Sequence, residues 1–163
     1  MSLREALVAL ENSGLGTAVR ESFVLFPWIE SVHVLAVVVV VGAVIVMDVR
    51  LLGWGAHRSG VRKLIAEVLP YTWIAFVIAA SSGFALFASA ATQYWDNIAF
   101  RLKFAGMLFA AVNMLVFHVA TSRSIANWDE HQRTPMAARI AGAVSISCWV
   151  FVVAAGRWIG FVG

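Results

Sequence analysis

Four ionisable residues lie within or near the ends of long apolar runs: Glu30, His33, Lys103 and Arg157. A charged side chain at the centre of a bilayer costs about 2.5–3.5 kcal/mol on insertion scales, so such residues are functional candidates. A neutral imidazole at His33 could donate electrons to heme iron or to copper. It could also form a hydrogen bond with a neighbouring helix, or with Glu30 three positions earlier on the same helical face.

Two of these residues are basic and favour an anionic group beside His33. Lys103 and Arg157 could hold heme propionates, the headgroup of a quinone, or the carboxylate of Glu30. Long basic side chains near helix ends also extend to the membrane interface without a further role. That interpretation is the simpler one for Lys103. It is weaker for Arg157, which lies a turn or more inside its apolar run.

His118 forms a second candidate site together with Met114, one helical turn earlier on the same face. A His/Met pair can bind copper or heme, although residues at this spacing more often serve packing. Asp48 is an alternative partner for His118. At about 1.5 Å of rise per residue, His33 and His118 differ in level by about 15 Å or more, so they should not ligate one heme.

These residues are carried by four apolar runs that are long enough to cross a bilayer. Of the 163 residues, 61% are hydrophobic and 13% are charged, whereas soluble domains average about 25% charged. About 20 apolar residues span the hydrocarbon core. We expect spans at about residues 26–47, 71–91, 103–121 and 140–162. Only helices and closed barrels satisfy every backbone group in lipid, and these runs lack the alternation of barrel strands.

The predicted fold class is therefore all-α, a four-helix transmembrane bundle that forms a single integral membrane domain over residues 1–163. An amphipathic helix at about residues 2–12 precedes the bundle, and we expect it to lie in the membrane interface. Glycines in the first loop and Pro70 separate the first two spans. Residues 95–97 mark the second loop, and residues 127–130 mark the third.

Basic residues predict the orientation of the bundle. The first and third loops carry Arg50, Arg58, Arg62, Lys63, Arg123, Arg133 and Arg139. The positive-inside rule places both loops in the cytoplasm and both termini in the periplasm. The N-terminus lacks the apolar core and cleavage site of a signal peptide.

Composition and motifs exclude several classes of protein. The long apolar runs exclude a nucleic-acid module. The formal charge is +3, and the basic residues lie between the apolar runs, where they set topology. The one cysteine, Cys148, cannot form an intramolecular disulfide. G-x-S-x-G, phosphate-loop, C-x-x-C and H-E-x-x-H motifs are absent from the sequence. Whether the protein is an enzyme stays open.

Motifs along nearly the whole chain resemble a family of uncharacterised small four-helix bacterial inner-membrane proteins. They lie at residues 22–53, 97–103, 113–118 and 155–157, and they include Pro27, Glu30, His33, Gly42 and Asp48-Val49-Arg50-Leu51-Leu52-Gly53. This resemblance implies the bacterial inner membrane as the location and brings no established activity.

A looser resemblance concerns HemJ-type protoporphyrinogen oxidases and the membrane domain of CopD-type copper proteins. His33, Gly42 and Arg50-Leu51 look like the first HemJ helix, and Lys103 with His118 looks like a later one. In the HemJ family a helix-borne histidine ligates heme b and a lysine is needed for function. The resemblance would assign these roles to His33 and Lys103.

These observations predict a heme b-binding membrane redox protein that exchanges electrons with a quinone or a porphyrin-type partner near the outer face. The heme site would comprise His33 as iron ligand, with Glu30, Lys103 and Arg157. One alternative is a copper-handling protein that uses His33 or the His118 pair. Another is a cofactor-free structural subunit. Besides lipid, a second copy of the chain or another membrane subunit could be a partner, and nucleic acid is not expected.

Overall fold

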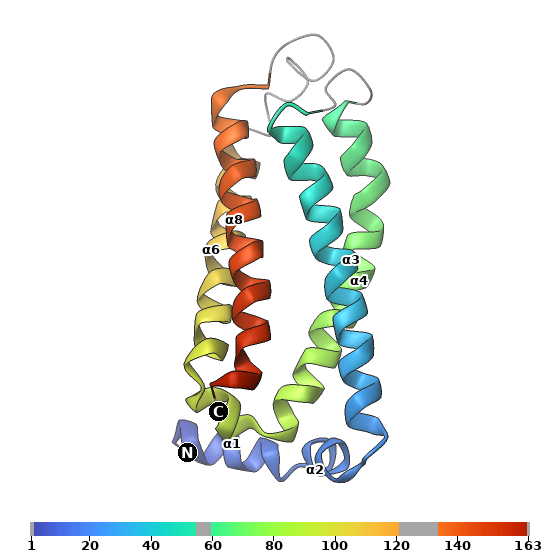
Figure 1. Ribbon diagram of the computed structural model, residues 1–163, viewed down its shortest axis with the longest axis vertical. Helices are drawn as coiled ribbons and strands as arrows, with labels where there is room; N and C mark the ends of the chain where they lie inside the picture. The colour runs from blue at the N-terminus through green and yellow to red at the C-terminus, as the bar shows by residue number, and fades with distance from the viewer. Residues whose placement is uncertain (1, 55–59, 121–133, 163) are drawn as a thin grey trace.

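The computed structural model describes residues 2–54, 60–120 and 134–162, and within these ranges it is helical without strands. Three short helices lie across one end of the molecule, which we call the cap end (Figure 1): α1 (Leu3–Glu11), α2 (Gly14–Glu21) and α5 (Ala91–Asp96). Four long helices form the body: α3 (Leu25–Leu51), α4 (Val61–Ser89), α6 (Ile98–Ala120) and α8 (Met136–Trp158), the last followed by the 3-10 turn η2 (Ile159–Phe161). The predicted all-α, four-helix fold with an N-terminal helix is confirmed.

All four long helices are long and apolar enough to cross a membrane. Many of their large apolar side chains face outward; Leu108 and Phe109 of α6, for example, are 66% and 69% exposed. Apolar surface of this extent is stable against lipid and unfavourable against water. The chain is therefore a multi-pass membrane protein whose long helices contact the bilayer.

Each long helix begins before its predicted span, most clearly α4, whereas α8 ends at Trp158, before the predicted end at residue 162. This helix begins at Val61, so Pro70 lies inside it and does not open it as expected from the sequence. The first turns of α4 are polar enough to lie at the interface, where Lys63 and Glu67 pair at 4.0 Å. A proline within a membrane helix is tolerated when its surroundings satisfy the backbone groups that it frees.

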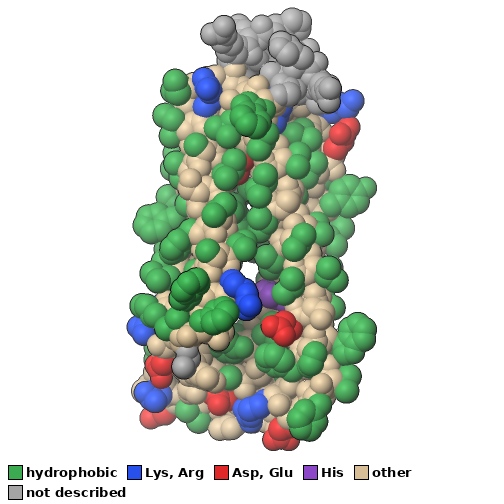
Figure 2. Space-filling view, in the orientation of Figure 1, with side chains coloured by type: hydrophobic (Ala, Val, Ile, Leu, Met, Phe, Trp, Pro, Cys, Tyr) green, Lys and Arg blue, Asp and Glu red, His purple; other side chains and the backbone are tan. Residues whose placement is uncertain are grey.

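The bundle consists of two helix pairs, α3 with α4 and α6 with α8, which meet mainly through α3 and α8. Away from the cap end this contact is close, because a Cβ on Gly142 would lie 2.9 Å from the Asp48 carbonyl oxygen. At the cap end, the ring of Phe87 in α4 stacks on that of Phe100 in α6, with centroids 5.3 Å apart. Between these two contacts Figure 2 shows a hollow between the pairs.

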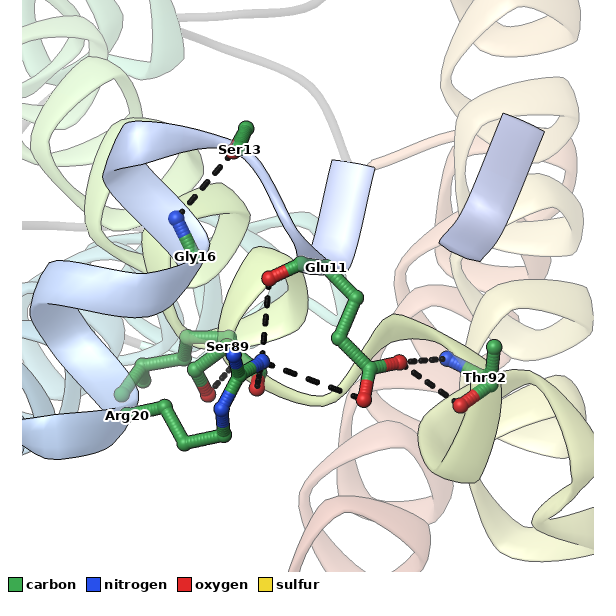
Figure 3. A network of polar contacts seen from close by, with 7 residues as sticks. Glu11, Ser13, Gly16, Arg20, Ser89 and Thr92 are labelled. Carbon is green, nitrogen blue, oxygen red and sulfur yellow. Dashed lines mark hydrogen bonds and ion pairs between the residues drawn. The ribbon is translucent and has the colours of Figure 1, made fainter. Parts of the chain in front are cut away.

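A polar network holds α1 and α2 against the corner between α4 and α5 (Figure 3). The N–H and hydroxyl of Thr92 donate to Glu11 Oε2 at 3.1 and 2.6 Å. Arg20 donates to the Glu11 carbonyl at 2.9 Å and to the Ser89 carbonyl at 3.2 Å. Gly16 allows the close approach, since a Cβ there would lie 2.6 Å from the Ala88 carbonyl oxygen.

Candidate functional site

His33 lies on α3 and its imidazole bonds to α4. Its Nδ1 is 2.9 Å from the Ala79 carbonyl oxygen and 3.1 Å from Ser82 Oγ. Because a carbonyl oxygen only accepts, Nδ1 must carry the ring proton. The Ser82 hydroxyl donates to the Ile78 carbonyl at 2.6 Å, which leaves its lone pairs free to accept from Nδ1. In the neutral imidazole the other ring nitrogen, Nε2, therefore keeps its lone pair.

This arrangement is typical of a histidine that ligates a metal, in which the second nitrogen donates to a carbonyl and fixes the ring. Within the described part of the chain, no hydrogen bond engages Nε2. The bond to a neighbouring helix, one of the two alternatives open from the sequence, thus exists and uses only Nδ1. The other alternative, a hydrogen bond between His33 and Glu30, is not formed among the described residues.

Gly83 supplies the space in which the imidazole lies. A Cβ at this position would lie 2.8 Å from His33 Cε1 and 3.2 Å from Nδ1. Any side chain here would move the ring. Ala79, Ser82 and Gly83 were not among the candidates from the sequence. Their signal in the sequence is Ser81-Ser82-Gly83, a polar and flexible interruption of an apolar run.

Lys103 belongs to the other helix pair and lies close enough to His33 for their charges to interact. It is half-buried, more than one turn inside α6. A Cβ on Gly156 of α8 would lie 3.8 Å from Lys103 Nζ, so the ammonium rests against the α8 backbone. Among the described residues no carboxylate pairs with it. A partly desolvated ammonium of this kind favours an anionic partner.

Glu30 is exposed and lies one turn before His33, toward the cap end. It interacts electrostatically with His33 and with Tyr94 of α5. Burial, and to a smaller extent the Glu30 carboxylate, raise the pKa of the Tyr94 phenol above its ordinary value of 10.0. Tyr94 thus lies within electrostatic reach of Glu30. It was not a candidate from the sequence, because the segment between the second and third spans was expected to be a loop.

Arg157 lies at the edge of the group and has a contact of its own. It follows Gly156, is exposed, and places its guanidinium 4.9 Å from the centre of the Phe161 ring. Such a cation–π contact holds the side chain near η2. The structure thus brings together Glu30, His33 and Lys103, with Arg157 next to the glycine that Lys103 touches. Figure 2 shows basic, histidine and acidic side chains beside the hollow.

The second candidate site lacks such an environment. Met114 is 62% exposed on α6, and His118 is exposed as well. Asp48, its alternative partner from the sequence, has the Ser145 hydroxyl of α8 as a neighbour. In the part of the chain that the structure describes, no three His, Cys, Asp or Glu side chains gather around one point.

A family model described as a family of unknown function, DUF6644, matches residues 12–162. The chain belongs to this family. The match agrees with the predicted resemblance to an uncharacterised family, and it covers α2 through η2 with all the site residues. No curated protein and no solved structure matches the chain.

Proposed function

We propose that this member of the family binds heme b between its helix pairs, with His33 Nε2 as the residue that would ligate the iron. It would exchange electrons with a quinone or a porphyrin-type partner near the outer face of a bacterial inner membrane. Heme, when bound, supplies one-electron chemistry, while the chain supplies the ligand, an anchor and apolar surroundings. The looser HemJ-type resemblance would assign the ligand role to the same histidine.

One observation carries the proposal, namely the hydrogen bond from His33 Nδ1 to the Ala79 carbonyl. It leaves the Nε2 lone pair for a ligand, and a bond of this kind orients the ring and strengthens its donor nitrogen. Heme would bring its own nitrogen donors to the iron, so a single histidine from the chain would suffice to hold it. A bare metal ion would need more donors than the described residues gather at this place.

Lys103 supports the proposal from the opposite helix pair. Its half-buried ammonium, beside His33 and without a carboxylate partner among the described residues, suits a heme propionate. Arg157 provides a second cation at the edge of the site. Glu30 and Tyr94 add a carboxylate and a phenol that can hold or release a proton where a quinone is reduced.

Expression with ample heme, followed by an absorption spectrum of the purified protein, tests the proposal. The wild type should show a Soret band, and His33→Ala should lose it while circular dichroism and gel filtration stay unchanged. His118→Ala is the matched control and should keep the band. Lys103→Ala should weaken heme binding about tenfold or more, the cost of a charge-assisted hydrogen bond, without abolishing it.

The same samples separate the alternatives. A wild type that is colourless and metal-free after expression with heme and copper would refute the redox function and favour a structural subunit. Bound copper that His33→Ala removes would instead support the copper-handling alternative. Loss of the Soret band only in His118→Ala would show that the other histidine is the ligand.

A further inference from the structure

Asp48 is a buried acidic residue that the proposed heme site does not use. It lies near the end of α3 away from the cap and is 6% exposed. His33 stands fifteen positions earlier on the same helix, which corresponds to about 22 Å. The two residues therefore belong to separate sites.

The Asp48 carboxyl has few polar neighbours. The Ser145 hydroxyl of α8 lies beside it, and Asp48 Oδ2 has no hydrogen-bond partner among the described residues. Arg50 is also buried, but residues two apart on a helix point in different directions. A buried carboxylate without a facing cation loses several kcal/mol of hydration that nothing restores.

The packing around Asp48 is dense and mostly apolar. A Cβ on Gly142 would lie 2.9 Å from the Asp48 carbonyl oxygen and 3.2 Å from Leu51 Cβ. Leu51 itself packs in a buried apolar cluster with Val61 and Ala138. A metal cation needs several oxygen ligands, and this contact offers one carboxyl and one hydroxyl. A proton needs only one lone pair.

We propose that Asp48 is a proton-binding site, a neutral carboxylic acid at the contact between the two helix pairs. The proton neutralises the carboxyl and lets α3 and α8 pack closely at Gly142. Loss of this proton to water would leave a negative charge on Asp48 in this contact, and hydration of that charge would separate the two helix pairs. Lys63 pairs with Glu67. The other described ionisable groups at the end of the bundle away from the cap are Arg50, Arg62, Lys63, Glu67, His118 and Arg139.

Infrared spectroscopy of the protein in lipid vesicles at neutral pH tests this proposal. The wild type should show the C=O stretch of a carboxylic acid, shifted in D2O, and Asp48→Asn should remove it. Asp96→Asn is the control, because its side chain is 64% exposed, and it should leave the band unchanged. Asn has the shape of the neutral acid, so the thermal midpoint of Asp48→Asn should stay near that of the wild type.

Three results would overturn the proposal. They are absence of the band from the wild type, its persistence in Asp48→Asn, and its loss when sodium or potassium is added at constant pH, which would show a cation site. Should Asp48→Asn fail to fold, carbon-13 NMR of wild-type protein labelled at its three aspartates gives the same answer. One carboxyl must then show the chemical shift of a protonated acid at neutral pH.

Discussion

At His33, one backbone carbonyl determines which nitrogen of the imidazole is available for chemistry. Ala79 accepts the Nδ1 proton, Ser82 supports the same nitrogen, and Gly83 leaves room for the ring. These three residues come from one stretch of α4. The properties of the candidate ligand are thus set by the helix that faces it.

Gly83→Ala tests this arrangement. The added methyl would lie 2.8 Å from His33 Cε1, so the ring must move and the Nδ1 bond must lengthen. Losing a hydrogen bond worth about 1 kcal/mol should lower heme affinity about fivefold. Titration of the apoprotein with heme, followed by absorbance, measures this change.

Gly42→Ala is the matched control, because a Cβ on Gly42 meets nothing within 4 Å. It should bind heme like the wild type. If Gly83→Ala bound heme as tightly as Gly42→Ala, the space at Gly83 would have no bearing on the ligand.

At the scale of the helices, side-chain hydrogen bonds join separate elements at the cap end. Asn97 is 8% exposed and directly precedes α6, where its Oδ1 accepts from the N–H groups of Ala99 and Phe100. Its amide nitrogen donates to the carbonyls of Ile159 and Val162. One side chain therefore caps α6 and ties it to the C-terminal turn.

The contact of α1 with α5 should depend on pH through Glu11. The Thr92 hydroxyl, then the Thr92 N–H, and to a lesser extent Arg20, lower the pKa of Glu11 below its usual 4.5. A carboxyl with a lower pKa in the folded state stabilises that state above its unfolded pKa, and this contribution is lost as the pH falls through the folded value. Glu11→Gln should therefore lower the thermal midpoint at neutral pH.

Thermal unfolding across a pH series measures this effect. The difference between wild type and Glu11→Gln should shrink as the pH falls below about 4.5. Glu21→Gln, a change at an exposed residue of α2, should leave the midpoint unchanged. A difference for Glu11→Gln that is the same at every pH would contradict the role of its charge.

In the molecule as a whole, both termini and the short helices lie at the same end (Figure 1). The two helix pairs touch at Gly142 and again at the stacked rings of Phe87 and Phe100. The candidate heme site lies in the half toward the cap, and Asp48 lies in the other half. The orientation of the molecule in the membrane thus decides which compartment each site faces.

Cysteine labelling determines that orientation. In a Cys148→Ser background, Gln93→Cys on α5 should react with a membrane-impermeant maleimide added from outside. Ser59→Cys, at a position outside the described residues, should be protected, because the basic residues around it favour the cytoplasm. The reverse pattern would invert the assignment, yet Glu30, His33 and Lys103 would remain on one side together.

The class of the protein and its helices follow from the sequence, because the length and hydropathy of a run are local properties and a bilayer has a known thickness. His33 and Lys103 could be chosen as candidate site residues for a similar reason, because an ionisable residue within an apolar run is visible in the sequence alone. The predicted start of the second helix at Pro70 was wrong, because a proline is a weaker stop signal in a membrane helix than in a soluble one.

The partners of these residues could not be read from the sequence, because they lie far along the chain. The bond from His33 to Ala79, the contact of Lys103 with Gly156, and the burial of Asp48 against α8 all depend on which helices pack together. In an apolar bundle most helix faces look alike, so hydropathy does not specify that packing. Close contacts at small residues specify the packing instead. These contacts form only when the helices pack together, so they depend on the tertiary structure.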